Sequence, residues 1–325
     1  MTGAPQISSL SQHWPPKPKW PLSDIPDLSD RVIVVTGGNS GIGYETVAEL
    51  MRHKAKVYLA TRSKSRADAA IEQLRKLPDI NGSVEFVELD LGDFRSIEAF
   101  AKNFAAREKR IDVLFNNAGV ACTKPTTTAQ GYEAHMGINA IGTHYLTTLL
   151  LPLLKAGGVA HPDFPTRVVF TSSYMHILAP PKGFDAEDPL AEKVSPPFGF
   201  NRMLQLYGLS KFCNILSARY FQRSYGSDNI IFTSVHPGAV RTNLANDANA
   251  VVSFIKDYVV SYVMISAKQG AYTQLYAGFS PGGLIGGAYF VPYGREAATV
   301  EQGNDIKAQD AFAKWADEEV AKHPA

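Results

Sequence analysis

The chain has 325 residues, of which 45% are hydrophobic, so it is long enough to bury a large core in a globular domain. Its formal net charge of +1 excludes a strongly basic surface, and we expect no nucleic acid as a partner. Its two cysteines are too few for a disulfide framework and indicate a reduced, cytoplasmic setting, and its eight scattered histidines predict no metal site.

Residues 1–29 form a proline-rich N-terminal extension that contains no apolar run of the kind found in a signal peptide. Its prolines disfavour a helix, so we expect a segment that either lies extended or is a disordered tail. In the extended form, Trp14 and Trp20 would attach it to the domain surface. The remaining residues, 30–325, are predicted to form one domain.

A β-branched run at 32–35 opens this domain and is typical of a parallel strand buried on both faces. Further strands are predicted at 57–60, 84–89, 113–115, 168–170, 230–235 and 286–291, and helices at 41–53, 65–77, 96–109, 131–154 and 203–225. This alternation predicts a doubly wound parallel sheet with helices on both faces, which is the Rossmann fold. In such sheets ligands bind at the carboxyl ends of the strands.

The sequence TGGNSGIG, residues 36–43, follows the first strand and opens the first helix. A dinucleotide pyrophosphate requires this arrangement, because residues without a Cβ let the backbone approach it and the helix start offers free N–H groups. The alternative is a merely tight turn, which the strand and helix context disfavours. The expected cofactor contacts are Gly37, Asn39, Ser40, Gly41, Ile42 and Gly43.

The residues after the second strand, Ala60-Thr61-Arg62-Ser63-Lys64, contain no acid that would hold the ribose hydroxyls. Arg62 can instead form forked hydrogen bonds to a 2′-phosphate. We therefore predict NADP(H) as the cofactor, bound by Thr61, Arg62 and Ser63 with Lys64 as a further candidate. Alternatively, Lys64 and Arg66 only solvate the next helix.

Three later segments also follow predicted strands and are expected beside the cofactor. Asp90 and Leu91 would hold the adenine, although Asp90 could equally cap the next helix. The small residues Asn117, Ala118 and Gly119 suit a backbone that passes close to a ligand. After the sixth strand, where His236 is expected to be structural, the contacts are Pro237, Gly238, Val240 and Thr242.

Among the fourteen tyrosines, Tyr207 is the one with a lysine four residues on, and this spacing places Tyr207 and Lys211 on one helix face. Hydride reduction of a carbonyl leaves an alkoxide that needs a proton donor and a second hydrogen bond. Tyr207 would donate, and a serine of the Ser172-Ser173 pair would hold the oxygen. We expect the lysine ammonium, at roughly 4 Å, to lower the pKa of the phenol toward neutrality.

Together, TGxxxGxG, Asn-Asn-Ala-Gly at 116–119, a serine before an inserted segment, YxxxK and HPGxVxT resemble the short-chain dehydrogenase/reductase family over about 30–279. The glycine spacing resembles its classical branch, and Arg62 resembles the retinol dehydrogenase and WW-domain oxidoreductase type. The resemblance implies a catalytic set of Asn139, Ser173, Tyr207 and Lys211, with Ser173 chosen over Ser172 and Asn139 holding a water beside Lys211. Otherwise Asn139 lies on a solvated face and Ser173 bonds its own backbone.

The interval between the serine and the tyrosine is longer than is usual in that family, and residues 176–206 are expected to form a wall or lid of the substrate site. The expected substrate contacts are Ser173, Tyr174, His176, Phe198, Phe200 and Tyr207. Residues 243–266, with Phe254, Tyr258 and Tyr262 at helical spacing, form either the opposite wall or packed core. We therefore expect NADPH-dependent reduction of a lipophilic or aromatic aldehyde or ketone to its alcohol.

Other roles stay open at this stage. The apolar stretch 251–265 is too short to span a bilayer but could touch a membrane surface weakly. The long helices around Asn139 and Tyr207 could form a homodimer, as the resemblance implies. The alternative functions are an NADPH-binding redox sensor that interacts with a partner without turnover, and a lyase or epimerase that retains its cofactor.

Overall fold

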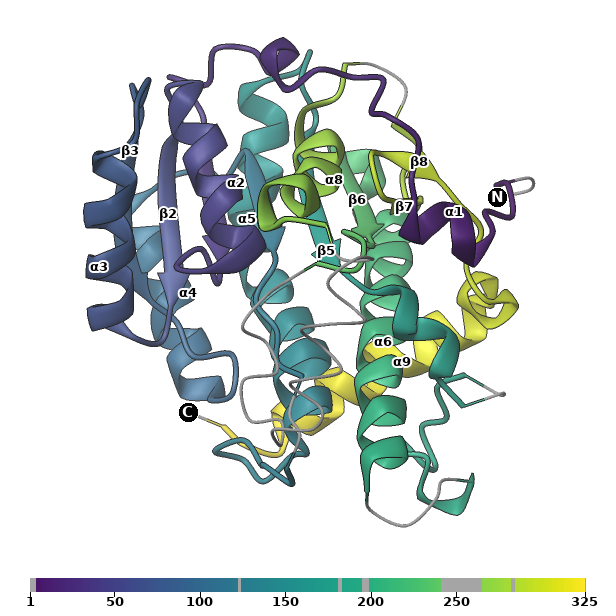
Figure 1. Cartoon of the computed structure of the whole chain (residues 1–325). Helices are drawn as coiled ribbons and strands as arrows, with labels where there is room; N and C mark the ends of the chain where they lie inside the picture. The colour runs from purple at the N-terminus through teal and green to yellow at the C-terminus, as the bar shows by residue number, and fades with distance from the viewer. Residues whose placement is uncertain are drawn as a thin grey trace.

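An eight-stranded sheet lies at the centre of the computed structural model, which describes residues 4–121, 124–180, 183–194, 199–240, 265–281 and 284–324 (Figure 1). The strand order is β3-β2-β1-β4-β5-β6-β7-β8, and all neighbours pair in parallel except β7 and β8. The strands are β1 Val32–Thr36, β2 Lys56–Thr61, β3 Ser83–Glu88, β4 Val113–Asn116, β5 Thr166–Thr171, β6 Ile230–Val235, β7 Tyr289–Val291 and β8 Arg295–Glu296.

Helices cover both faces of the sheet because the central strands are apolar on both sides. In β1, Ile33 and Val35 pack toward α2, α3 and α8, whereas Val32 and Val34 pack toward α4, α5, α6 and α9. These helices are α2 Gly41–Arg52, α3 Lys64–Arg75, α4 Phe94–Arg107, α5 Thr143–Ala160, α6 Phe200–Tyr225, α8 Ala267–Phe279 and α9 Ile306–Ala321. The predicted doubly wound fold is confirmed.

Shorter elements complete the described chain. They are the α-helix α1 Ser9–His13, the π-helix η2 His135–Gly142 and the 3₁₀ helices η1 Leu22–Asp24, η3 Tyr174–Leu178, η4 Glu192–Val194, η5 Gly226–Asp228 and η8 Glu301–Asn304. The sheet reverses its direction of winding between β1 and β4, which are neighbours. A ligand crevice is expected outside the carboxyl ends of these two strands.

The predicted helix at 131–154 differs from the structure in two ways. Its first part is the π-helix η2, in which the chain bulges by one residue around Asn139. Its second part, α5, continues through Pro152 to Ala160 because the packed apolar face outweighs the loss of one backbone hydrogen bond. The helices α8 and α9 were not predicted, since neither carries a sharp motif.

The N-terminal extension is neither a tail nor wholly extended, and Figure 1 shows it crossing from α1, beside β7 and β8, over the top of the sheet to β1. Between Pro5 and Pro15 the chain is free of proline, and Ser8 caps the short helix α1. Trp20 is buried against Tyr272 and Tyr276, whereas Trp14 is 58% exposed. The prediction was therefore wrong for the helix and for Trp14.

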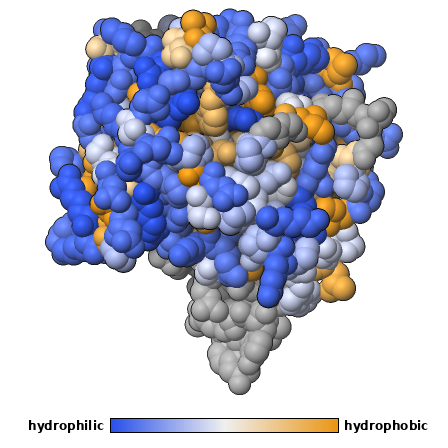
Figure 2. All heavy atoms as spheres, turned by 90° about the horizontal axis from the view of Figure 1, so that it is seen from above, coloured by the Kyte–Doolittle hydropathy of each residue, from blue (hydrophilic) through white to orange (hydrophobic). Residues whose placement is uncertain are grey.

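The surface seen from above, at the end where the strands begin, is mainly hydrophilic (Figure 2). Apolar residues appear on it only in small groups. In the described part of the chain no helix has the length and apolar character needed to cross a membrane. The apolar stretch at 251–264 lies outside the described residues, so its contact with a membrane or a substrate stays a prediction.

Candidate active site

The glycine loop joins β1 to α2 at the carboxyl end of the sheet. Gly37 has a φ of +68°, and a Cβ at Gly43 would lie 2.4 Å from the Gly37 carbonyl oxygen. Ser40, the residue before α2, makes no side-chain cap, so the helix dipole and its first N–H groups can act on an anion. Asn39 and Gly41 are half-exposed beside Ser40, and Ile42 is buried. The loop fits a pyrophosphate.

Thr36 fastens this loop to the segment that follows β4, a role that sequence reasoning missed. Its hydroxyl donates to the Phe115 carbonyl oxygen at 3.1 Å and accepts from the N–H groups of Asn117 and Ala118 at 3.0 and 2.9 Å. The Asn117 side chain donates to the Thr36 carbonyl oxygen at 2.8 Å. A threonine at the last position of a buried strand was the signal available in the sequence.

Arg62 and its neighbours lie at the end of β2, on the same edge of the sheet. Thr61 is half-buried, and Arg62 is exposed and forms no ion pair within the described residues. Ser63 accepts a hydrogen bond from the N–H of Arg66 and so caps α3, and Lys64 forms an ion pair with Asp68 at 2.7 Å. These contacts turn Ser63 and Lys64 toward α3 and leave Arg62 as the guanidinium open to a phosphate.

Asp90 does not cap α4, so that alternative was wrong. The cap is Asp93, which accepts from the N–H of Arg95, while Asp90 accepts from the N–H of Gly92 at 2.8 Å. The N–H of Asp90 is bound by the Ser96 hydroxyl. Leu91 is buried beside it. The half-buried Asp90 carboxylate stands at the edge where the adenine is expected.

The structure separates the roles of the two serines after β5. Ser172 is buried, and its hydroxyl donates to the Lys211 carbonyl oxygen at 2.7 Å. Ser173 is half-exposed, its hydroxyl caps η3 by accepting from the N–H of Met175 at 3.2 Å, and it lies close enough to Tyr207 to lower the pKa of the phenol. Adjacent strand residues face opposite sides, which explains why one hydroxyl reaches the phenol and the other does not.

Tyr207 and Lys211 lie one helical turn apart on α6, and the Lys211 ammonium is 5.8 Å from the centre of the Tyr207 ring. Lys211 is buried and donates to the Thr171 carbonyl oxygen at 2.8 Å. Burial lowers the pKa of Lys211 to about 8 and raises the pKa of Tyr207. The expected lowering of the Tyr207 pKa by Lys211 is not found, because desolvation of the phenol is the largest effect and Ser173, not Lys211, acts against it.

Asn139 is buried rather than on a solvated face. Its amide accepts from the N–H of Val120 at 2.8 Å and donates to the Val120 carbonyl oxygen at 2.9 Å and the Ser210 hydroxyl at 3.1 Å. A Cβ at Gly119 would lie 3.1 Å from both the Asn139 oxygen and the Lys211 nitrogen. The backbone at Gly119 thus passes between these two side chains, and only hydrogen fits there without displacement.

The turn after β6 closes the far side of the crevice. His236 is buried, which lowers its pKa to about 3, and its ring accepts from the N–H of Gly238 at 3.3 Å. Pro237 is buried, Gly238 has a φ of +104° and Val240 bridges to Ile265. Thr242 and Phe198 lie outside the described residues, as does the side chain of Phe200, which begins α6.

His135 is a second residue that sequence reasoning missed. It is buried one turn before Asn139, it lies 2.6 Å from Glu133, and its ring meets the Tyr207 ring edge-on at 5.9 Å. The hydrogen bond to His135 lowers the pKa of Glu133, although burial acts the other way. The four-residue spacing between His135 and Asn139 could have indicated a shared face toward α6.

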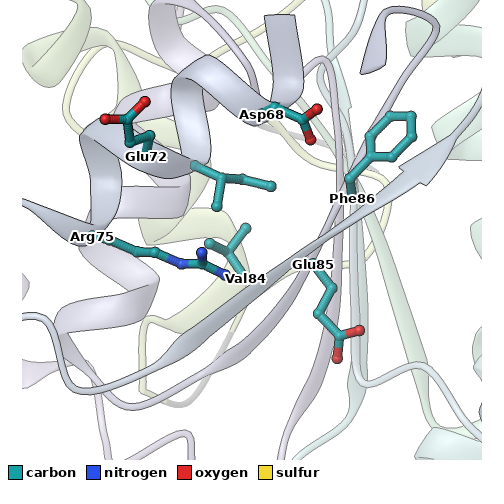
Figure 3. A pocket seen from close by; sticks show the side chains of 7 residues that line it. Asp68, Glu72, Arg75, Val84, Glu85 and Phe86 are labelled. Carbon is teal, nitrogen blue, oxygen red and sulfur yellow. The ribbon is translucent and has the colours of Figure 1, made fainter. Parts of the chain in front are cut away.

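A separate pocket lies away from these residues, between α3 and the edge strand β3. Figure 3 shows the side chains that line it, which are Asp68, Ile71, Glu72, Arg75, Val84, Glu85 and Phe86. None of them is a predicted site residue. In the ranges that the structure describes, no group of three or more His, Cys, Asp or Glu residues is placed to bind a metal ion.

Known proteins resemble the chain in sequence and in fold. The model of the short chain dehydrogenase family matches residues 31–179. A short-chain dehydrogenase/reductase of Armillaria gallica is 38% identical over 313 residues, which cover 95% of this chain and 96% of that protein. The structure of an uncharacterized protein from Mycobacterium paratuberculosis has a TM-score of 0.70 and 29% identity, covering 93% of this chain and 97% of that one.

A more distant likeness concerns the fold alone. The NADPH-bound carbonyl reductase from chicken fatty liver has a TM-score of 0.60 and 20% identity, covering 83% of this chain and 99% of that one. The strand order and the glycine loop at the switch point are those expected of this family, and the sequence match extends over nearly the full chain. The chain therefore belongs to the short-chain dehydrogenase/reductase family of oxidoreductases.

Proposed function

We propose that the protein is an NADPH-dependent reductase that converts a lipophilic or aromatic aldehyde or ketone to its alcohol, reversibly. The observation that carries this proposal is the meeting of Ser173, Tyr207 and Lys211 beside the glycine loop, with Ser173 close enough to Tyr207 to lower the pKa of its phenol. A carbonyl oxygen placed against both hydroxyls would receive one hydrogen bond and one proton. These are the two requirements of an alkoxide formed by hydride addition.

NADP(H) fits the crevice on three features of this chain. A Cβ at Gly43 would clash with the glycine loop, so the absence of a side chain there lets the start of α2 lie close to that loop. The helix α2 begins without a side-chain cap, and Arg62 is exposed. The pyrophosphate would lie on the loop and the 2′-phosphate on Arg62. The nicotinamide half of the cofactor would contact Asn117, Ala118, Gly119, Gly238 and Val240. When bound, NADPH would supply the hydride for the reduction.

Burial raises the pKa of Tyr207, so the phenol holds its proton at neutral pH and can donate it. Burial lowers the pKa of Lys211 to about 8, so this ammonium, which lies near Asn139, could resupply a proton to Tyr207. We infer that Asn139 positions Lys211 and the Gly119 backbone, because its amide groups bond to Val120 and Ser210.

Substrate contacts are proposed at Ser173, Tyr174 and Tyr207, which are half-exposed. His176 is buried and bonds to the Ser173 carbonyl oxygen at 2.8 Å, so it supports the wall from behind. Arg62 supports the narrower assignment to the retinol dehydrogenase and WW-domain oxidoreductase type. A homodimer through α5 and α6 is disfavoured, because α9 packs across both helices (Figure 1).

The test is replacement of Tyr207 by Phe. We expect turnover of NADPH with aromatic aldehydes to fall by roughly 10²- to 10⁴-fold, because the proton donor is lost. NADPH affinity, followed by fluorescence titration, should stay within about twofold of wild type. Tyr220→Phe, which removes a phenol farther along the same helix, is the matched control and should keep full activity. Retained turnover in Tyr207→Phe would contradict the mechanism, and a wild type that binds NADPH without oxidising it would contradict the function.

A further inference from the structure

The N-terminal segment 4–14 is fastened over the end of the sheet that carries β7 and β8. The N–H of Ala298 donates to the Pro5 carbonyl oxygen at 2.9 Å, and Arg295 donates to both the hydroxyl and the carbonyl oxygen of Ser11, at 2.8 and 2.7 Å. Ile7 packs against the apolar cluster that contains Tyr289. These contacts hold the helix α1 at a fixed place beside the active site.

From this place α1 presents His13 to Tyr174, the residue directly after Ser173. The two rings meet edge-on, with centres 5.7 Å apart and an angle of 77° between their planes. The Ser9 carbonyl oxygen lies 2.8 Å from His13 Nδ1 and orients the imidazole. Trp14, whose ring is 6.2 Å from that of His13, is largely exposed.

Further rings are buried behind Tyr174. Tyr174 lies 6.1 Å from His236, and His176 lies 5.1 Å from Tyr289. Burial raises the pKa of Tyr289, and the nearby hydroxyls of Tyr174 and Tyr207 raise it further. We call His13, Tyr174, His176, His236 and Tyr289 the aromatic wall; His13 and Tyr174 are its partly exposed members, and His176, His236 and Tyr289 are buried behind them.

We propose that His13, together with Tyr174, determines which carbonyl compounds the enzyme accepts, by forming the outer part of the aromatic wall against which a flat aromatic group of the substrate lies. This inference rests on the proposed function. To that function the inference adds a class of substrate, an aryl aldehyde or aryl ketone, and the residues that select this substrate. Removal of one edge-on aromatic contact corresponds to a three- to tenfold weaker interaction.

The test uses the full chain with His13→Ala and compares aryl ketones with small aliphatic aldehydes. For aryl ketones kcat/KM should fall about three- to tenfold through KM, while kcat, the KM for NADPH and the rates with aliphatic aldehydes stay unchanged. His13→Phe keeps a ring at this position and should restore the aryl preference. Leu10→Ala, on the exposed side of the same helix, is the matched control and should match wild type.

Two results would overturn the inference: an equal loss with aryl and aliphatic substrates, or a lower melting temperature in His13→Ala with no change of preference. Calorimetric binding of the same aryl ketones to the NADP⁺-loaded protein tests the wall independently of turnover. Wild type should bind them and His13→Ala should bind them about three- to tenfold more weakly. Equal affinities, or no binding by wild type, would count against the wall, whereas binding without turnover would count against the proposed reaction only.

Discussion

Arg62 is the residue through which we propose that the site selects NADPH over NADH. It is exposed at the end of β2, while its neighbours Ser63 and Lys64 are engaged by α3. We predict that Arg62→Asp raises the KM for NADPH by about 100-fold relative to that for NADH, because it would replace the proposed charge-assisted hydrogen bonds to the 2′-phosphate by a repulsion. The measurement is steady-state kinetics with both cofactors at a fixed carbonyl concentration.

Arg66→Asp makes the same charge change one turn farther along and serves as the control for Arg62. It should leave the ratio of the two KM values close to that of wild type. An unchanged ratio in Arg62→Asp would refute the assignment of the 2′-phosphate to this guanidinium. A selective effect in Arg66→Asp would move the site into α3.

At the scale of elements, α9 packs against both α5 and α6. Its Phe312 is fully buried, faces Phe184 and His144, and joins the apolar cluster between α5 and α6. The helix therefore belongs to the core, even though it lies at the end of the chain.

We predict that Phe312→Ala lowers the free energy of unfolding by about 3–5 kcal/mol, because it leaves a cavity in this cluster. Urea denaturation followed by circular dichroism measures the change. Lys314→Ala, on the exposed side of α9, should change stability by less than about 0.5 kcal/mol. A small effect of Phe312→Ala would show that α9 adds little to the stability of the domain.

For the whole molecule, three buried histidines make stability depend on pH. Burial lowers the pKa of His144 to about 3, of His176 to about 4 and of His236 to about 3. In the unfolded chain they titrate near 6.5. Because the folded state binds fewer protons, their contribution is complete above pH 6.5 and is lost as the pH falls toward 4.

We therefore expect the free energy of unfolding to be roughly 3 kcal/mol lower at pH 5.5 than at pH 6.5, about 1 kcal/mol for each histidine. This window lies above the range in which carboxyl groups titrate. Urea titrations at the two pH values measure the difference, and His144→Asn should reduce it by about a third. A difference below about 1 kcal/mol would mean that these rings are not held neutral.

The sequence was sufficient for features that depend on near neighbours along the chain. Three such features are the β-branched run at Val32–Thr36, the spacing of the loop glycines and the interval from Tyr207 to Lys211. Each is a pattern of residues that lie close together in the sequence. From these the doubly wound sheet could be predicted, with most strand and helix boundaries within a few residues of the structure. The carboxyl edge as the location of the site followed from the same patterns and the handedness of βαβ units.

Only the tertiary structure decided which residues meet across long separations in sequence. It showed that Ser173 rather than Ser172 faces Tyr207, that α9 covers α5 and α6, and that the N-terminal segment carries His13 to Tyr174. It also reversed the expected direction of the Tyr207 pKa shift. Burial and contact depend on the packing of distant segments, and no local pattern in the chain encodes that packing by itself.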